Sequence, residues 1–469
     1  MHGFDNRGLY APAGNFAVSG RFGRMFPAAP CLQHFHPGPE ALGAVDGPMD
    51  GGLTPPDDTS QDNTRIKAGY TFLGQFIDHD ITLDATSILE RQIDVDATHN
   101  FRTPALELDS LYGRGPDMQP YLYEPDGMRF MLSEDAGDLP RNRHGRALIG
   151  DHRNDENLII SQLHLLFLKF HNRVVESQTD PDAPAGERFL EAQTIVRRHY
   201  QWIVLHEFLE RTIGKAVVDA LRAHNPFTYA PDVDPFIPVE FSVAAFRFGH
   251  SQARSGYALR DGVGGLLFPA PGTPAGAPDM RGFKPVPPER AIDWAFFFGG
   301  EPQAQAGMMI DTKIATPMLN LPDGVVPGAP RSVATRNLQR GIDARLPSGQ
   351  FAAEVMLPPA ERLNNDQIWS AAGGHGPAPL WYYILREAEV MTGGTHLAGV
   401  GAQIVGRTFL ALLTHDPASY LHAAPHWMPT LPRADSNTFT MVDLINFTEG
   451  RTIAQEQFEK AAERSPEHA

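Results

Sequence analysis

The feature that most constrains the fold is a run of polar residues inside an otherwise apolar segment. Residues 72–81 read FLGQFIDHDI. With helical spacing, Gln75 and His79 lie one turn apart on the same face, while Asp78 and Asp80 point to different sides of the axis. The apolar positions would bury this segment, and buried carboxylates are costly unless a cation, a covalent bond or good donors receive them. The segment therefore predicts either a functional site or, alternatively, a capped or solvated acidic helix face.

The composition indicates a soluble globular chain. Its 469 residues are 42% hydrophobic and 20% charged, which is enough for a large core, and length alone would allow two or three domains. The formal net charge of -17 at pH 7 argues against nucleic acid or an anionic membrane as the main partner. No apolar run has the length of a membrane span.

The cysteine content and the N-terminus bear on the compartment. Cys31 is the only cysteine, so no intrachain disulfide can form, as in proteins of reducing compartments. The first residues lack a basic start followed by an apolar run, so we recognise no signal peptide. We expect a soluble protein that is cytoplasmic or exported without a recognisable signal peptide, and the sequence leaves the oligomeric state open.

Apolar periodicity predicts a mostly α chain without a clear series of strands. Asn154 is expected to cap the strongest helix, and the PDG turn within residues 121–132 suggests a hairpin. The helices are predicted at about 66–84, 154–178, 186–223, 288–300, 306–318, 351–357, 379–392, 396–414 and 441–447.

Four further stretches place charged or polar side chains where a site would need them. Each has an ordinary explanation, such as an ion-paired helix end, a satisfied core histidine, a capped helix or a polar loop. The stretches are RTPALELDSLYG (102–113), GDHRNDEN (150–157), AFRFGHS (245–251) and TRNLQRG (335–341).

Together with GQFIDHD, and in this order along the chain, these motifs resemble the animal-type haem peroxidase family of the peroxidase–cyclooxygenase superfamily. The resemblance spans roughly residues 66–415. It implies one large, mostly α-helical domain around a haem, with long irregular loops and very little β structure. We therefore expect an extended arm over residues 1–62, the peroxidase domain over 63–450 and a C-terminal tail over 451–469.

The resemblance implies a haem b cofactor with roles for five residues. His250 matches the proximal ligand of the iron, and Asn337 matches the residue that accepts its ring N–H. His79 matches the distal histidine, which would move a proton between the two oxygens of hydrogen peroxide. Arg153 would stabilise charge on the leaving oxygen. Gln75 would order a water or halide beside His79.

The resemblance also implies contacts with the haem edge. Asp78 and Glu156 match acids that form ester bonds to the haem in mammalian members, so the haem is a candidate for covalent attachment. The methionine that makes a third link there is replaced by Asn157. Arg247 and Arg340 match residues that bind the haem propionates, for which a guanidinium fork is suited.

A calcium ion is the second implied cofactor. Asp80, Thr103 through its hydroxyl and carbonyl, Ala105 through its carbonyl, Glu107 and Asp109 match the family's oxygen ligands. Glu107 is longer than the usual aspartate, and Asp109 replaces a usual serine. The geometry of the site is therefore expected to differ from the family pattern.

The implied function is peroxidase activity in the response to oxidative stress. The substrates would be hydrogen peroxide and a small anionic or aromatic reductant, namely a halide, thiocyanate or a phenol. Loss of the methionine link suggests bromide, iodide or thiocyanate rather than chloride. The main alternative is a fatty-acid dioxygenase, which resembles this fold but has a tyrosine three residues before the proximal histidine. Arg247 occupies that position here.

Two other classes are disfavoured by the residues. A metal phosphohydrolase built on the DHD triplet would need more histidines at metal-ligand spacing, and His164 and His171 are explained more simply by helix packing. A carrier of haem or calcium without turnover would not explain why His79 is accompanied by Arg153.

Overall fold

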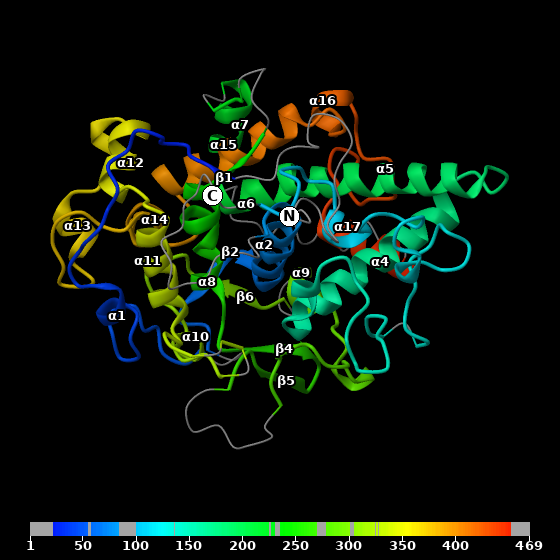
Figure 1. Ribbon diagram of the computed structural model, residues 1–469, viewed down its shortest axis with the longest axis horizontal. Coiled ribbons are helices and arrows are strands. Elements are labelled where there is room, and N and C mark those ends of the chain that lie inside the picture. The colour runs from blue at the N-terminus through cyan, green and yellow to red at the C-terminus, as the bar shows by residue number, and fades with distance from the viewer. Residues whose placement is uncertain are drawn as a thin grey trace, which may run out of the picture.

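Helices form the body of the protein, as the sequence predicts, and α2 (Ala68–Ile81) lies near its centre (Figure 1). The computed structural model describes residues 22–451, apart from 55–57, 84–99, 136, 225–226, 230–234, 270–277, 301–303, 324 and 327. Among the helices within these ranges, none combines the length and the apolar character needed to cross a lipid bilayer.

Helix α2 is buried on several sides. It packs against α4 (Leu158–Gln178), α8 (Gly249–Gln252) and α9 (Ala295–Phe298). Phe76 of α2 stacks on Phe167 of α4 with 4.6 Å between ring centroids. Gly69 allows the close approach of α9, because a Cβ there would lie 2.7 Å from the carbonyl oxygen of Phe297. These contacts leave the polar end of α2 directed at neighbouring elements rather than at bulk water.

Helix α4 begins later than predicted. A 3₁₀ turn, η3 (His152–Asp155), precedes it, and the Oδ1 atom of Asn157 caps it by accepting from the backbone N–H of Ile160 at 2.9 Å. The prediction that Asn154 caps this helix is wrong. The side chain of Asn154 is fully buried and binds two histidine rings instead.

The long predicted helix over residues 186–223 is interrupted. Gly214, with φ +85°, ends the run before a final separate helix. The segment consists of α5 (Ala185–Ile203), the π-helical turn η4 (Val204–Phe208), α6 (Leu209–Ile213) and α7 (Lys215–Ala223).

Most of the remaining helices lie where the periodicity places them. One further helix, α11 (Val333–Asp343), was not predicted and is capped by Ser332, whose hydroxyl accepts from Thr335 N–H at 3.1 Å. The confirmed helices are α12 (Gly349–Met356), α14 (Leu380–Thr392), α15 (Gly399–His415) and α17 (Met441–Glu449).

Two predicted helices are wrong. Within residues 288–300 only η7 (Pro288–Arg290) and the single turn of α9 are helical. Within residues 306–318 the chain forms the strand β6 (Ala306–Met308) and then the short α10 (Thr316–Leu319). Pairing of β6 with a distant strand overrides the local periodicity.

The described strands form three two-stranded ribbons. β2 (Asp62–Lys67) pairs antiparallel with β6, and β4 (Gly256–Arg260) pairs antiparallel with β5 (Val263–Leu266). β1 (Phe22–Gly23) pairs in parallel with β3 (Ile237–Pro238) and attaches the N-terminal segment to the body. The hairpin expected within residues 121–132 is reduced to one bridge between Tyr123 and Phe130.

Short helical turns fill the connections between these elements, and the buried apolar side chains of the described residues form one cluster. The turns are α1 (Pro39–Leu42), α3 (Asp109–Tyr112), η2 (Pro120–Leu122), η5 (Glu240–Ala244), η6 (Ala245–Phe248), η8 (Pro359–Glu361), α13 (Asn365–Trp369) and α16 (Tyr420–Ala423).

Candidate active site

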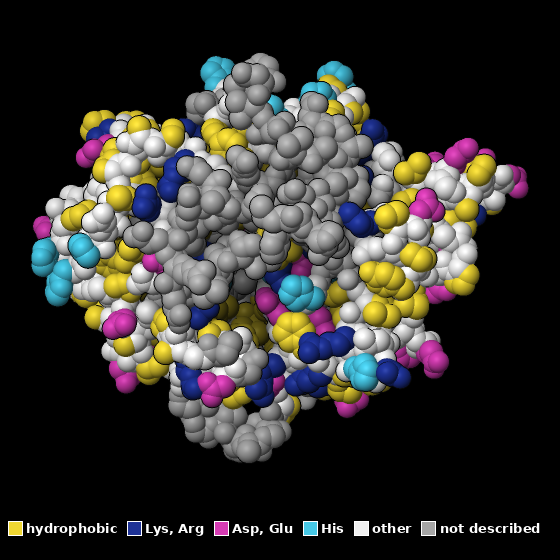
Figure 2. Space-filling model, viewed as in Figure 1, with side chains coloured by type: hydrophobic (Ala, Val, Ile, Leu, Met, Phe, Trp, Pro, Cys, Tyr) yellow, Lys and Arg dark blue, Asp and Glu magenta, His cyan; other side chains and the backbone are white. Residues whose placement is uncertain are grey.

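Two histidines from packed elements define the candidate site. His79 lies in the last turn of α2, and His250 lies in α8, which packs against α2. A Cβ built on Gly249 would meet no atom within 4 Å, so there is open space beside His250. Figure 2 shows a recess near the centre of one face, where acidic, basic and histidine side chains gather around apolar ones.

His79 is held as a neutral ring. It is 5% exposed, and its Nδ1 lies 2.7 Å from the Oδ1 atom of Asn154. Burial, assisted by the positive charge of Arg153, lowers the pKa of His79 to about 3. Its second ring nitrogen, Nε2, lies 3.9 Å from the Oε1 atom of Glu156. His79 therefore combines a neutral ring with a free edge that faces other polar side chains.

Gln75 and Glu156 occupy the space beside this edge. The Nε2 atom of Gln75 donates a short hydrogen bond to Glu156, and the Nδ2 atom of Asn157 donates to Gln75 Oε1 at 3.3 Å. The Glu156 side chain is 40% exposed, yet the protein around it withholds enough water to raise its pKa to about 7, against the opposing charge of Arg153. The prediction that Gln75 and His79 share one face is confirmed, and Glu156 joins them.

Asp78 lies beside this group but is directed elsewhere. The hydroxyl of Thr82 donates to its Oδ1 atom at 3.0 Å. Burial raises the pKa of Asp78, while the charges of Arg153 and Arg247 oppose that rise. Arg247 belongs to the same segment as His250, and this segment continues into α8, which packs against α2.

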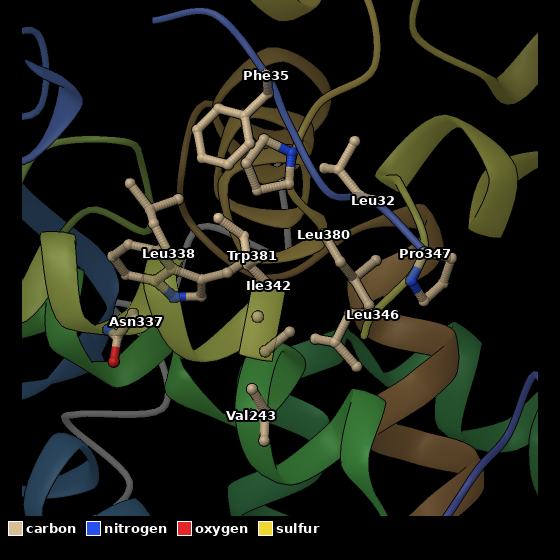
Figure 3. Close-up of a pocket in the computed structure, with 13 residues that line it drawn as sticks. Leu32, Phe35, Val243, Asn337, Leu338, Ile342, Leu346, Pro347, Leu380 and Trp381 are labelled. Atoms are coloured by element: carbon tan, nitrogen blue, oxygen red, sulfur yellow. The ribbon is translucent and has the colours of Figure 1, made fainter. Parts of the chain in front are cut away.

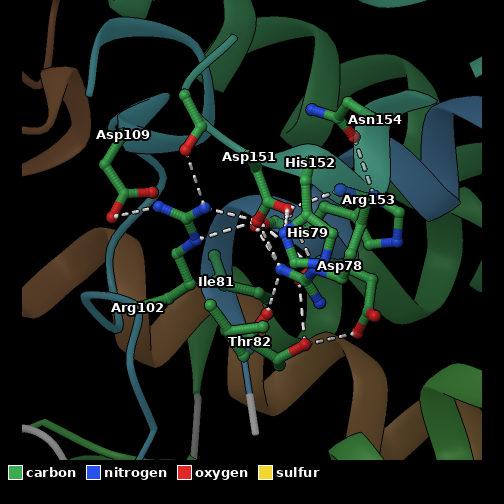
Figure 4. Close-up of polar contacts among 12 residues, drawn as sticks. Asp78, His79, Ile81, Thr82, Arg102, Asp109, Asp151, His152, Arg153 and Asn154 are labelled. Atoms are coloured by element: carbon green, nitrogen blue, oxygen red, sulfur yellow. Dashed lines mark hydrogen bonds and ion pairs between the residues drawn. The ribbon is translucent and has the colours of Figure 1, made fainter. Parts of the chain in front are cut away.

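The Arg153 side chain is fixed by acceptors on three sides (Figure 4). Its Nε atom donates to both carboxylate oxygens of Asp151 at 3.2 Å, and its Nη2 atom donates to Asp151 Oδ2 at 2.8 Å. Nη2 also donates to the carbonyl oxygens of His79 at 3.0 Å and Thr82 at 2.6 Å. Nη1 takes part in none of these bonds, and the side chain remains 19% exposed. One edge of the guanidinium is thus anchored and the other is available.

Two residues of this network were missed by the sequence analysis. Asp151 is buried between two guanidinium groups, because Arg102 donates to its Oδ2 atom from Nε at 3.2 Å and through a short bond from Nη2. The Nη1 atom of Arg102 lies 3.3 Å from the Oδ2 atom of Asp109. Asp151 could have been found from the sequence, because it lies only two residues before Arg153 in the same motif. Arg102 could not, because no sequence pattern links it to Asp151, 49 residues away.

On the opposite side, His250 contacts Asn337 of α11. The Nδ1 atom of His250 lies 2.7 Å from the Nδ2 atom of Asn337, whose Oδ1 atom accepts from Arg247 Nη1 at 3.1 Å. Burial and the nearby charge of Arg247 lower the pKa of His250 to about 3. The pair forms as predicted, but the amide nitrogen faces the ring. The predicted bond, with Asn337 as acceptor, requires the amide turned the other way. Arg340, one turn further along α11, is partly exposed.

A small apolar pocket lies behind this pair (Figure 3). It is lined by Val243, Asn337, Leu338 and Trp381, together with Leu32 and Phe35 from the N-terminal segment. Its volume is about 10 Å³. That is room for about one water molecule, so this pocket is part of the packing around α11 rather than a substrate site.

The predicted cation ligands lie around the end of α2. Leu108, at φ +60°, donates from its backbone N–H to Asp80 Oδ2 at 3.1 Å and so fixes the loop onto α2. Several other oxygens of this group are buried and accept no hydrogen bond from the described residues. These oxygens are Asp80 Oδ1, Thr103 Oγ1, Glu107 Oε1 and Asp109 Oδ1. Unpartnered buried oxygens of this kind are costly and fit a missing positive partner.

The charges of these acids act on one another. Burial raises the pKa of Asp80 well above its usual value, and the charges of Asp109 and Glu107 raise it further. The pKa of Glu107 is raised to about 7, mainly by burial. Within the described residues, however, no group of three or more His, Cys, Asp or Glu side chains converges closely enough to form a metal site by itself. A cation here would therefore rely on Thr103 and on backbone carbonyls as well.

The residues at the end of α2 and in the segment that leads into α8 fit a haem. His250 has a neutral ring whose Nδ1 atom contacts Asn337, and with the Asn337 amide turned so that its oxygen accepts from Nδ1, Nε2 would be the bare nitrogen that can bind iron. A neutral histidine and an anchored arginine lie on the other side, and Arg247 and Arg340 provide positive charge for propionates.

Comparison with known proteins connects these motifs to one family. Residues 100–269 match the family model for animal haem peroxidase. A chorion peroxidase of Aedes aegypti is 24% identical over 316 residues, which are 63% of this chain and 37% of that protein. A peroxidase-like protein of Margaritifera margaritifera is 38% identical over 112 residues, 23% of this chain and 14% of that protein. The chain thus spans well under half the length of these relatives.

Solved structures share the fold at low sequence identity. Peroxidase A of Dictyostelium discoideum superposes with a TM-score of 0.65 and 17% identity, covering 94% of this chain and 96% of that chain. The fatty acid alpha-dioxygenase of Oryza sativa superposes with a TM-score of 0.56 and 15% identity, covering 92% and 78%. The mostly helical architecture is therefore common to both, and the site residues have to distinguish their chemistries.

Proposed function

Because this chain belongs to the animal haem peroxidase family, we propose that it is a haem peroxidase that reduces hydrogen peroxide and oxidises a small anionic or aromatic donor. The observation that carries the proposal is the pairing of a neutral His79 with the anchored Arg153. Helix α2, whose last turn holds this histidine, packs against α8, which carries His250. A peroxidase needs such a base and such a fixed positive charge on the same side of the cofactor.

The protein's part in the reaction is to move one proton. The free edge of His79 takes the proton from one peroxide oxygen and returns it to the other, which then leaves as water. The guanidinium of Arg153 is positively charged, and its Nη1 edge, which takes no part in the bonds to Asp151, would stabilise the charge that develops on the leaving oxygen. A bound haem would supply the iron redox chemistry, and the residues that would hold it are His250, through the iron, and Arg247 and Arg340, through the propionates.

Gln75 and Glu156 bear on the reducing substrate. The side-chain amide of Gln75 lies beside the free edge of His79 and would hold a water or a halide there. Asn157 occupies the position of the family's linking methionine and donates to Gln75 instead. We propose bromide, iodide, thiocyanate or a phenol as the donor, because a haem without that link is less oxidising.

Fatty-acid dioxygenation is the alternative that the shared fold raises. It would need a phenol close to the proximal histidine to abstract hydrogen. Arg247 occupies that position, and its neighbours Phe246 and Phe248 are buried apolar rings. These residues favour the peroxidase. Oxygen uptake with a long-chain fatty acid, in the absence of peroxide, would instead support the dioxygenase.

The decisive experiment separates cofactor binding from turnover. Purified protein supplied with haem should show a histidine-ligated ferric spectrum, which His250→Ala should lose. His79→Ala and Arg153→Ala should keep the spectrum but react with peroxide on the order of a hundredfold to ten-thousandfold more slowly. His426→Ala, at an exposed site, is the matched control. Unchanged stopped-flow rates in both distal variants would overturn the proposal.

We further propose a calcium ion bound by Asp80, Thr103, Ala105, Glu107 and Asp109. The support is the set of buried oxygens without a donor, together with carboxylates whose pKa values are raised by burial and mutual repulsion. Hard oxygen ligands of this type suit calcium. The cation would neutralise the repulsion that the buried acids otherwise exert on one another.

A covalent haem is the last part of the proposal. Asp78 and Glu156 are carboxyls whose pKa values are raised by burial, and both border the space between α2 and α8. We propose that each forms an ester with a haem methyl group: a carboxylate oxygen replaces one methyl hydrogen, and hydrogen peroxide, as the two-electron oxidant, is reduced to water. The esters would remove the charges of both carboxyls. Mass spectrometry of denatured, peroxide-treated protein should then show haem on the chain, and Asp78→Ala plus Glu156→Ala should release it. Only the bare chain mass in the unmutated protein would contradict the esters.

A further inference from the structure

Asn154 lies between two histidine rings from different helices. Its Oδ1 atom is 2.7 Å from Nδ1 of His79 in α2, and its Nδ2 atom is 2.9 Å from Nδ1 of His164 in α4. Asn154 and His164 are completely buried, so bulk water does not compete for these bonds. Figure 4 shows the contact between Asn154 and His79 beside the guanidinium of Arg153.

The chemistry of the amide decides which ring nitrogens carry hydrogen. An amide nitrogen only donates, so the Nδ1 atom of His164 must accept and the hydrogen of that neutral ring lies on Nε2. An amide oxygen only accepts, so the Nδ1 atom of His79 must carry a hydrogen. In the neutral ring of His79, Nε2 is then the bare nitrogen.

The reverse arrangement would have the opposite consequence. If the amide of Asn154 turned over, its nitrogen would donate to His79 Nδ1, and the ring hydrogen would move to Nε2. A ring with hydrogen on Nε2 cannot take a proton at that edge, which is the edge that faces Glu156 and Gln75. In that reversed arrangement the Nδ1 atom of His164 would carry the hydrogen, and its Nε2 atom, which is buried without a hydrogen-bond partner among the described residues, would be bare.

We infer that Asn154 is a positioning residue: its side-chain oxygen keeps the hydrogen on Nδ1 of His79 and so leaves the Nε2 edge of that ring free as a base. The inference rests on the proposed function for its consequence in catalysis. The hydrogen positions themselves do not depend on that function. Only Nε2 of His79 is available to a substrate, because Nδ1 is hydrogen-bonded to the buried amide of Asn154, 75 residues away in sequence.

The first test reads the hydrogen positions without turnover. In the full-length protein labelled with ¹⁵N-histidine, protonated and bare ring nitrogens resonate at well-separated frequencies, and His79→Gln identifies the His79 signals. We expect hydrogen on Nδ1 and a bare Nε2 for His79. Hydrogen on Nε2 would overturn the inference, even if the protein proved to be an active peroxidase.

The second test uses variants of the haem-loaded protein. Asn154→Ala should keep the haem spectrum and slow the reaction with peroxide on the order of tenfold to a hundredfold, as partial loss of a general base would. Asn154→Asp keeps an acceptor for His79 Nδ1 and should recover most of the rate. Asn437→Ala, on the surface, is the control.

The outcomes separate the two claims. Asn154→Ala within twofold of the unmutated rate, or Asn154→Asp as slow as Asn154→Ala, would overturn the positioning role. A protein in which His79 has the expected hydrogen positions but which does not react with peroxide would overturn the proposed function and leave the assignment of Asn154 in place. If Asn154→Ala does not fold, the ¹⁵N measurement on the unmutated chain still decides.

Discussion

At the scale of single residues, buried ion pairs orient the charged side chains of the candidate site. Asp151 is the clearest case, since it receives hydrogen bonds from both Arg153 and Arg102. Burial alone would raise the pKa of Asp151, but these two guanidinium groups hold it well below its usual value. The carboxylate is thus ionised in the folded protein, and the orientation of Arg153 follows from it.

Asp151→Asn should therefore lower both stability and activity. The variant leaves two buried guanidinium groups facing an amide, and breaking a buried ion pair costs about 3–5 kcal/mol of unfolding free energy. Because the folded-state pKa is depressed, the stabilisation from Asp151 is present above its unfolded pKa and is lost as pH falls through the lower folded value. Urea denaturation at pH 7 and at pH 2, which is below the unfolded pKa of an aspartate, measures both effects.

A surface ion pair provides the comparison for this variant. Asp219 lies 3.0 Å from Lys215 on α7, and both side chains are more than half exposed. Asp219→Asn should change stability by less than about 1 kcal/mol. If Asp151→Asn cost no more than Asp219→Asn and left the peroxide reaction unchanged, Asp151 would have no part in placing Arg153.

At the scale of elements, the end of α2 and residues 102–109 act as one unit. Leu108 joins the loop to Asp80, and the loop carbonyls of Glu107 and Leu106 accept from Arg197 at 2.6 Å and Gln201 at 2.9 Å on α5. A left-handed Leu108 is held only because these contacts surround it. The proposed calcium ion would sit where the two elements meet.

Chelation should loosen this junction. We expect a lower thermal midpoint in EDTA than in calcium chloride, and no such difference for Asp80→Asn. Because burial raises the pKa of Glu107 to about 7, and calcium requires ionised carboxylates, affinity should weaken as pH falls below about 7. Glu361→Gln, at an exposed site, should respond to EDTA as the unmutated protein does. Identical midpoints with and without calcium would argue against the ion.

At the scale of the whole molecule, the N-terminal segment is tied to the same half of the protein as His250. Glu240 in η5 is completely buried and accepts from the backbone N–H groups of Met25 at 2.9 Å and Phe26 at 3.1 Å. Arg24 donates to the carbonyl oxygens of Ala344 at 2.9 Å and Arg345 at 3.3 Å, just beyond α11. This segment therefore covers the helix that carries Asn337.

Glu240→Gln should detach the segment without unfolding the protein. Glutamine has one acceptor oxygen, and its amide nitrogen would face the second backbone N–H. Loss of one hydrogen bond to a charged acceptor costs about 1.5–3 kcal/mol. A cost of this size raises the population of molecules with a detached segment on the order of tenfold to a hundredfold. Trypsin cleavage at Arg24 should be faster by that factor. Glu354→Gln, on the surface of α12, is the control, and equal cleavage rates would refute the role of Glu240.

The sequence by itself determined most of the helices and named the residues expected at the candidate site. Helix α2, the end of α4, and α12, α14, α15 and α17 follow from apolar periodicity, which is a local property of the chain. The family resemblance, which comparison confirms, came from ordered motifs in the same way. The structure places Gln75, His79 and Glu156 together, and His250 beside Asn337.

Only the tertiary structure decided which partners these residues take. The strand β6 exists because it pairs with β2, and a helix was wrongly predicted there from local periodicity. Asn154 resembles a helix cap in sequence, but it binds His79, 75 residues away, while Asn157 caps α4. Arg102 reaches Asp151 across 49 residues. Such contacts depend on how helices pack, and packing brings together positions whose spacing along the chain carries no periodic signal.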